Sequence, residues 1–287
     1  MATLLEIDTL HLGFEGANGL TAALRGVSLS LARGECVALV GQSGSGKSVT
    51  GLTILRLLGA NARISQGAIR LDGEDLLALS EARMRTVRGG RIAMIFQNAK
   101  ASLNPIRRVG DTLVDIVRAH DRTGLSRKAA LAKVIGIMDA IGIALPEERA
   151  RAFPSELSGG MCQRIGIAVA LACEPELIIA DEPTSALDVT TQKLVMETLI
   201  RTCRGRGVAV LFITHDLALA SEYCDRALVM NAGRIVEEGP ATRVFTAPEH
   251  PYTRALLDAL PYGKTDASEL RPMEWEDPDT AGEGART

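Results

Sequence analysis

The 287-residue sequence is poor in aromatic residues, has no long apolar run and carries little net charge. Aromatic residues make up only 3% of it, so aliphatic side chains must fill most of the core that its 46% of hydrophobic residues can build. No apolar run approaches the ~20 residues that a membrane-spanning helix needs. The net charge of −3 provides no bulk attraction to nucleic acid, so we expect no nucleic-acid partner. These absences predict a soluble, cytoplasmic protein whose membrane role, if it has one, depends on a partner.

Clustered cysteines are missing too. Zinc sites and disulfide frameworks need closely spaced cysteines, and no two cysteines here form a C-x-x-C pair. Reduced, mostly buried thiols are therefore expected. The N-terminus has neither the basic start nor the apolar block of a signal peptide. The cysteines are Cys36, Cys162, Cys173, Cys203 and Cys224.

A glycine-rich segment at residues 41–48, with the pattern G-x-x-x-x-G-K-S, carries the first chemical signal. Residues 35–40 before it read as a buried strand, and residues 48–58 after it as a helix whose N-terminus favours an anion. Lys47 can reach the β- and γ-phosphates of a nucleotide, and the Ser48 hydroxyl can bind Mg²⁺. The alternative is a glycine-rich turn with a solvated lysine, but such a turn would not need a buried strand before it and a helix after it. The expected phosphate-binding residues are Gly41, Gln42, Ser43, Gly44, Ser45, Gly46, Lys47 and Ser48.

The rest of the chain reads as an α/β fold with a helical insertion at about residues 98–165. Within the insertion, apolar residues recur at helical spacing up to Met138, and Ser126 is a suitable cap. Residues 263–287 show little apolar periodicity, so a loosely ordered extension that Trp275 could anchor is expected. A helix is expected at 253–260, and strands at 27–31, 67–71, 91–96, 177–181, 208–214 and, as a hairpin, at 227–230 and 234–237.

The strand at 177–181 ends in two carboxylates. Asp181 can hold Mg²⁺ through water beside the phosphate loop, and Glu182 can orient and polarise an attacking water. Alone, such a pair would indicate only a solvated turn. Upstream, however, Leu157-Ser158-Gly159-Gly160 opens a second helix and so forms a second anion site.

With these segments the sequence resembles the ATP-binding cassette (ABC) ATPases, whose LSGG signature it copies. In the family's order, Gln97 is similar to the Q-loop glutamine, residues 185–188 to the D-loop and His215 to the switch histidine. Phe14 is similar to the aromatic residue that stacks on adenine, although it could equally belong to the core. The resemblance covers about residues 3–262.

The resemblance implies a P-loop NTPase fold: a mixed sheet core, an antiparallel β subdomain and a helical signature subdomain. The ATPase domain would span residues 1–245, and residues 246–287 would form a C-terminal extension of the oligopeptide-transporter type. Two such domains would hold two ATP molecules between the phosphate loop of one domain and the LSGG of the other.

The same resemblance assigns the site residues. Lys47 would clamp the phosphates and Glu182 would position the water, while His215 would hold both the γ-phosphate and Glu182. Mg²⁺ would be arranged by Ser48, Gln97 and Asp181. The remaining nucleotide-binding residues, several of them acting on the partner's ATP, would be Phe14, Ser158, Gly159, Gly160 and Asp188.

Three details resemble the ATPases of dipeptide, oligopeptide and nickel importers: residues 102–105, Met161 in the signature and His250-Pro251-Tyr252. This implies a peripheral subunit on the cytoplasmic face of the inner membrane that energises import of peptides or a related small solute. Its partners would be integral-membrane permeases, a second ABC ATPase (a heterodimer is favoured over a homodimer) and, indirectly, a periplasmic or extracellular solute-binding protein.

Two departures from the family pattern matter. No cysteine follows Cys224, so the iron–sulfur cluster of many relatives is not expected here, and Asn98 stands where relatives usually have an acidic residue. An alternative function is that of a non-transport ABC ATPase in a soluble complex such as carbon–phosphorus lyase. A DNA-repair or ribosome-acting protein would need a long coiled-coil insertion or a second cassette, and the sequence has neither.

Overall fold

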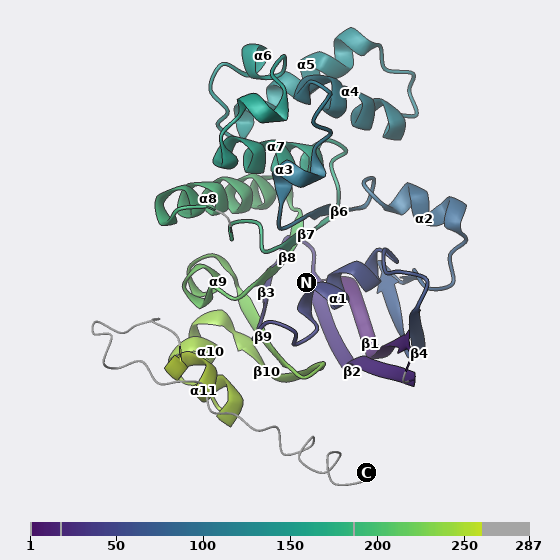
Figure 1. Cartoon of the computed structure of the whole chain (residues 1–287), viewed down its shortest axis with the longest axis vertical. Helices are drawn as coiled ribbons and strands as arrows, with labels where there is room; N and C mark the ends of the chain where they lie inside the picture. The colour runs from purple at the N-terminus through teal and green to yellow at the C-terminus, as the bar shows by residue number, and fades with distance from the viewer. Residues whose placement is uncertain (1, 18, 186, 260–287) are drawn as a thin grey trace.

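The computed structural model describes residues 2–17, 19–185 and 187–259; the predicted extension at 263–287 and Trp275 lie outside these ranges. Among the described residues, no helix has both the length and the apolar character needed to cross a membrane. Two β-sheets and several helices make up the molecule; in Figure 1 the helices between residues 99 and 206 lie above the sheets, and those between residues 217 and 259 lie to their left.

The larger sheet contains the predicted apolar strands. Its strand order is β10-β9-β3-β8-β7-β6, and all neighbours are parallel except the β9–β10 hairpin. Every residue of β3, β7 and β8 is buried, as expected of parallel strands that are covered on both faces. The strands are β3 (Cys36–Val40), β6 (Ile92–Ile95), β7 (Leu177–Asp181), β8 (Ala209–Thr214), β9 (Arg226–Asn231) and β10 (Arg234–Pro240).

The smaller sheet is antiparallel, in the order β2-β1-β4-β5. In β2 the predicted alternation is confirmed: Val27, Leu29 and Leu31 are buried, whereas Ser28 and Ser30 are exposed. The strands are β1 (Thr3–Gly16), β2 (Gly19–Ala32), β4 (Ala62–Leu71) and β5 (Glu74–Asp75).

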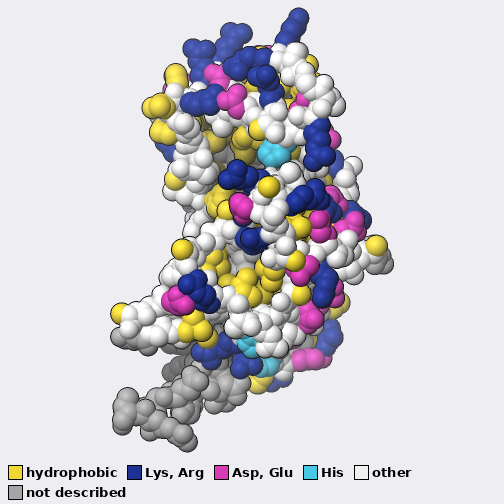
Figure 2. All heavy atoms as spheres, turned by 90° about the vertical axis from the view of Figure 1, so that its right-hand side faces the viewer, with side chains coloured by type: hydrophobic (Ala, Val, Ile, Leu, Met, Phe, Trp, Pro, Cys, Tyr) yellow, Lys and Arg dark blue, Asp and Glu magenta, His cyan; other side chains and the backbone are white. Residues whose placement is uncertain are grey.

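Most of the helices form the predicted insertion between β6 and β7 or cover the larger sheet (Figure 1). Ser126 caps its helix as predicted, because its hydroxyl accepts a hydrogen bond from the Ala129 N–H at 3.2 Å. Figure 2 shows Lys and Arg side chains gathered over the end of the molecule that the insertion forms. The helices are α1 (Lys47–Ile54), α2 (Glu81–Val87), α3 (Ala99–Ser102), α4 (Val109–His120), α5 (Arg127–Ala140), α6 (Pro146–Arg149), α7 (Gly159–Leu171), α8 (Val189–Arg206), α9 (Leu217–Tyr223), α10 (Ala241–Thr246) and α11 (Pro251–Ala259), with a 3₁₀ turn at Pro154–Glu156.

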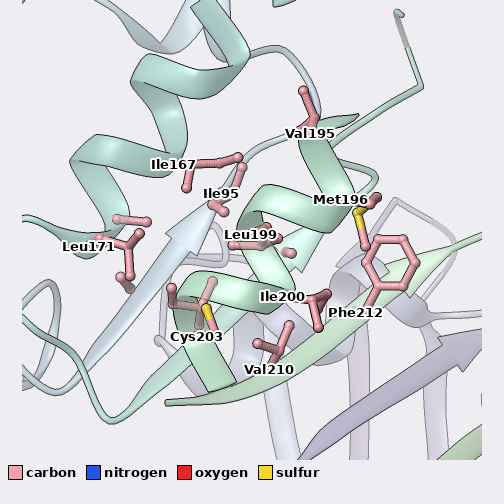
Figure 3. Close-up of a cluster of buried hydrophobic side chains, with 14 of the residues drawn as sticks. Ile95, Ile167, Leu171, Val195, Met196, Leu199, Ile200, Cys203, Val210 and Phe212 are labelled. Atoms are coloured by element: carbon pink, nitrogen blue, oxygen red, sulfur yellow. The ribbon is translucent and has the colours of Figure 1, made fainter. Parts of the chain in front are cut away.

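Aliphatic side chains join α7 and α8 to the larger sheet, as the scarcity of aromatic residues predicted. Figure 3 shows side chains of α8 gathered in one cluster with side chains of α7 and of the strands β6 and β8. This packing fixes the insertion's last helix to the sheet that carries the phosphate loop. The labelled residues are Ile95, Ile167, Leu171, Val195, Met196, Leu199, Ile200, Cys203, Val210 and Phe212.

Two helix boundaries differ from the prediction. The first helix was expected at residues 48–58, but α1 ends at Ile54. The Arg88 guanidinium donates to the carbonyls of Leu55 (2.7 Å) and Arg56 (3.2 Å), and Arg56 has a φ of 51°, so these contacts end the helix. The last helix, α11, begins at Pro251, where proline is favoured because a first helical residue needs no N–H partner.

Candidate functional site

Some of the predicted site residues lie at the ends of four neighbouring parallel strands. The glycine loop follows β3, Asp181 is the last residue of β7, His215 follows β8 and Gln97 follows β6. In the sheet these strands lie in the order β3-β8-β7-β6. Because carboxyl ends of parallel strands meet at one edge of a sheet, the topology gathers residues that are far apart in the sequence.

The glycine loop is shaped for close approach of its backbone. Gly41, Gly44 and Gly46 all have positive φ angles (151°, 80° and 109°), and a Cβ atom on Gly41 would lie 2.1 Å from the Met230 carbonyl oxygen. The Lys47 ammonium group donates to the carbonyls of Gly41 at 2.8 Å and Gln42 at 2.7 Å. The loop thus curls around its own lysine, in the concave form that a phosphate group needs.

Lys47 is only 6% exposed. Burial lowers its pKa, while the nearby carboxylates of Glu182 and Asp181 act in the opposite direction. A buried cation held by neutral carbonyls is a ready partner for an anion, because a phosphate would supply the negative charge that the carbonyls lack.

Ser48 and Asp181 are in direct contact. The Ser48 hydroxyl donates to Asp181 Oδ1 at 2.9 Å. Burial, together with the negative charge of Glu182, raises the pKa of Asp181, although Ser48 and Lys47 oppose this. A carboxylate in this position is stabilised by any cation that binds beside it.

The residues present suit Mg²⁺ held partly by phosphate oxygens. A hydroxyl and a carboxylate are oxygen ligands of the kind that Mg²⁺ takes together with water and substrate phosphates. No cluster of three His, Cys, Asp or Glu residues that could hold a metal occurs among the described residues. A site that depends on the nucleotide for its remaining ligands therefore fits better than a closed protein cage.

Glu182 is the residue on which the polar contacts converge. The Gln97 amide nitrogen donates to its Oε2 at 2.8 Å, and the His215 Nδ1 lies 3.0 Å from its Oε1. Glu182 has a φ of 45°, which is uncommon for a residue with a Cβ, and its N–H donates to the Ile213 carbonyl at 2.8 Å. Its side chain is 22% exposed and that of His215 is 61% exposed, so a ligand can reach both. The carboxylate is thus oriented by two polar neighbours and open to solvent.

A cavity of about 390 Å³ joins these groups. The glycine loop, Glu182 and His215 form part of its wall, and Leu217 and Leu256 complete it. Leu256 belongs to α11, a helix that the sequence alone did not connect with the site. The His-Pro-Tyr motif at the start of α11 was the available signal, but nothing in its spacing indicates which surface it packs on.

The LSGG residues line a different cavity, of about 560 Å³. Ser158 caps α7, where its hydroxyl accepts from the Met161 N–H at 3.3 Å, so the predicted helix start is confirmed. Asp188 caps α8 by accepting from the Thr191 N–H at 3.0 Å. Gly159, Gly160 and Asp188 line this cavity together with Ser158. The phosphate loop and the signature of one chain therefore do not face a common cavity.

Phe14, a predicted site residue, and Asn98, the departure from the family pattern, are not among the residues that line the two cavities. Phe14 is on β1, partly buried against the hydrophobic cluster beneath the antiparallel sheet, and its contact with adenine stays a prediction. Asn98 caps α3 by accepting from the Ala101 N–H at 3.0 Å.

The chain matches two protein families and is similar in sequence to ATP-binding proteins of peptide transporters. The family described as ABC transporter matches residues 24–185, and the family described as oligopeptide/dipeptide transporter, C-terminal region, matches residues 236–284. The chain is 48% identical to a probable peptide ABC transporter ATP-binding protein of Sinorhizobium fredii over 90% of this chain and 77% of the relative. It is 49% identical to the probable D,D-dipeptide transport ATP-binding protein DdpD of Escherichia coli over 90% of this chain and 78% of the relative.

A solved structure of a dimeric ATP-binding cassette in a post-hydrolysis state, bound to ADP and Pi, has a TM-score of 0.72 at 26% identity. The match covers 83% of this chain and 99% of that one. The mixed sheet, the antiparallel sheet and the helical insertion described above are therefore the fold of such a cassette.

Proposed function

Because the chain belongs to the ABC transporter family of ATP-binding proteins, we propose that it hydrolyses ATP to energise the import of peptides, or of a related small solute, through a membrane transporter. The names of its relatives support peptides as the cargo class. They do not favour an accessory role in a soluble enzyme complex. Its partners are membrane permeases and a second ATPase, with a heterodimer favoured, and it works on the cytoplasmic face of the membrane.

The observation that carries the catalytic part is the pair of contacts that Gln97 and His215 make with Glu182. A general base needs a fixed orientation, and these two contacts supply it from the loops that follow β6 and β8. Glu182 would accept a hydrogen bond from the attacking water and align the water's oxygen with the γ-phosphorus. As the bond to the leaving ADP oxygen breaks, His215 would hold both Glu182 and the departing phosphate.

Phosphate binding falls to the glycine loop and Lys47. The lysine would exchange the carbonyls of Gly41 and Gln42 for phosphate oxygens, which is favourable because a charged acceptor replaces neutral ones. Mg²⁺, when bound through Ser48, Asp181 and Gln97, would neutralise charge that develops on the phosphates. Removing the magnesium should therefore stop hydrolysis.

The signature residues would act on the nucleotide of the second ATPase. Ser158 and Gly160 lie at an open helix N-terminus in a cavity separate from their own chain's phosphate loop. We assign residues 1–245 to the ATPase domain, with 98–165 as the inserted helical part, and 246–287 to the C-terminal extension. A solute-binding protein on the far side of the membrane would deliver the cargo.

The test is to purify the tagged chain from gently solubilised native membranes, as wild type and as Glu182→Gln. We expect both to bring two multi-spanning permeases and a second ATPase with them. Wild type should hydrolyse ATP in a Mg²⁺-dependent way, and Glu182→Gln should lose about 10²- to 10⁴-fold in rate with ATP binding intact.

The two parts of the proposal fail separately. A soluble enzyme complex without permeases would overturn the transport role and leave the ATPase assignment standing. Near-normal hydrolysis by Glu182→Gln would remove Glu182 from its role and leave the transport assignment standing.

A further inference from the structure

Tyr252, from the His-Pro-Tyr motif, reaches the phosphate loop. Its side chain is fully buried, with 0% exposure. The backbone N–H of Gln42, the second residue of the loop, donates to the Tyr252 hydroxyl at 3.2 Å. A residue of the C-terminal segment thus holds a backbone group of the nucleotide site.

The helix that carries Tyr252 is fixed in place at its start. The Glu237 carboxylate, on β10, accepts hydrogen bonds from the N–H groups of Glu249 at 2.8 Å and His250 at 3.0 Å. The N–H of Tyr252 in turn donates to His250 Nδ1 at 3.1 Å. These contacts set the entry of α11, so the tyrosine ring reaches the loop from a fixed direction.

The same face of α11 continues into the site. Leu256 lies one helical turn after Tyr252 and therefore on the same side of the helix. It lines the cavity of about 390 Å³ together with Gln42, Glu182 and His215. One helix face therefore contacts the loop's backbone and closes part of the cavity next to it.

The peptide groups of Gln42 are held on both sides. Its N–H donates to Tyr252, and its carbonyl accepts from the Lys47 ammonium at 2.7 Å. If Lys47 turned to a phosphate, the carbonyl would lose that contact, whereas the bond from the N–H to the tyrosine does not involve Lys47. Burial raises the pKa of Tyr252, so the hydroxyl stays neutral and adds no negative charge beside the phosphates.

We propose that Tyr252 is a positioning residue for the phosphate loop, through which the C-terminal segment sets the affinity of the site for ATP. This inference rests on the proposed function, because it assigns a role within the same ATP site. It also gives the His-Pro-Tyr motif a physical purpose: the tyrosine ring fills the core and its hydroxyl holds the loop.

The test compares Tyr252→Phe with Tyr223→Phe. Both remove one hydroxyl. Tyr223, however, ends α9 and is not among the residues that line the cavity of about 390 Å³ beside the phosphate loop. We expect Tyr252→Phe to raise the Kd and the KM for ATP about 5- to 20-fold, because a loop N–H loses its partner. The kcat should change less than 2-fold, and Tyr223→Phe should match wild type in every value.

Hydrogen exchange of the loop amides supplies a readout that a merely structural tyrosine would not move. We expect the peptide containing Gln42 to exchange faster in Tyr252→Phe and at the wild-type rate in Tyr223→Phe. Glu237→Gln is a second variant, which loosens the start of α11 without touching the ring, and it should raise the Kd for ATP in the same direction.

A wild-type Kd in Tyr252→Phe, or a lower melting temperature with an unchanged Kd, would overturn the inference. Either result would leave the proposed function intact, because wild type would still bind and hydrolyse ATP. A wild-type chain that neither binds nor hydrolyses ATP would instead remove the proposed function itself.

Discussion

Asp181 and Glu182 are neighbours in the chain but lie in different environments. Asp181 is the last residue of a fully buried strand and is 9% exposed. Glu182 has left the strand with a positive φ, and its carboxylate faces Gln97 and His215. Two carboxylates in different surroundings can perform different tasks, and the proposed tasks are to hold a cation for Asp181 and to orient water for Glu182.

Replacing Asp181 by Asn should make the nucleotide-free protein more stable near pH 8, by about 1 kcal/mol. Burial and Glu182 raise the pKa of Asp181 in the folded protein. A raised folded-state pKa contributes stability that is present below the unfolded value, about 3.9, and is lost as pH rises through the folded value. The advantage of Asp181→Asn should therefore grow from about pH 4 to pH 8.

Thermal unfolding of both proteins across that pH range is the measurement. Asp181→Asn should also lose Mg²⁺-dependent ATP hydrolysis, which separates its effect on the site from its effect on the fold. A stability advantage that is equal at both ends of the range would contradict burial of the charged carboxylate as its cause.

The types of the site residues could be predicted from the sequence, but their contacts could not. The pattern around Lys47 predicts a phosphate loop, yet nothing in it indicates that the lysine rests on its own loop's carbonyls. Asp188 was predicted to bind nucleotide, which stays a prediction, and the fold shows that it caps α8. The Tyr252 contact depends on where α11 docks, which is decided by burial of its apolar face rather than by local sequence.

At the scale of secondary-structure elements, His120 joins the helical insertion to the core. It is the last residue of α4; its Nε2 lies 3.0 Å from the Arg88 carbonyl and its Nδ1 lies 3.2 Å from the Ile116 carbonyl. Arg88 itself holds the carbonyls that follow α1, the helix of the phosphate loop. A hydrogen-bonded path therefore runs from the end of α1 to the end of α4.

Replacing His120 by Ala should loosen the insertion. The change removes both ring contacts and leaves space beside Gly89, where a Cβ atom would lie 2.9 Å from the ring. We expect a loss of about 1–2 kcal/mol in the free energy of unfolding and faster hydrogen exchange in α4, measured by mass spectrometry.

His11→Ala is the matched control, since His11 also packs near a glycine, Gly26, but in the antiparallel sheet. Exchange in α4 should stay at the wild-type rate in that variant. Equal exchange in α4 for His120→Ala and wild type would show that the histidine does not hold the insertion.

The elements that were predicted well are those in which the burial of the side chains directly sets the pattern of apolar residues in the sequence. The strands β7 and β8 are buried on both faces, so they read as apolar runs with clear ends. The long strand β1 was not predicted, because register shifts and the positive φ of Thr9 (47°) interrupt its alternation. The predicted end of α1 was wrong because a distant arginine, Arg88, binds the two carbonyls that follow the helix.

At the scale of the whole molecule, the phosphate loop and the signature of one chain line two different cavities. The phosphate loop lines one cavity with Glu182 and His215, and the signature lines another with Asp188. In the proposed pairing, each segment is half of a nucleotide site and lacks the groups that the other supplies. Pairing with a second ATPase would bring them together, so the signature should affect hydrolysis without affecting its own chain's affinity for ATP.

Gly159→Glu tests this separation of the two halves. A Cβ at Gly159 would meet only Leu187, at 3.8 Å, so the side chain fits the isolated chain, and its carboxylate would repel a partner's phosphates. The complex purified from membranes should lose at least about 10-fold in ATP hydrolysis, while the isolated chain keeps its wild-type Kd for ATP. Gly205→Glu places the same charge on α8 where nothing lies within 4 Å, and it should leave both values unchanged. A Kd for ATP that rises in isolated Gly159→Glu would mean that signature and phosphate loop serve the same nucleotide within one chain, and the paired arrangement would have to be given up.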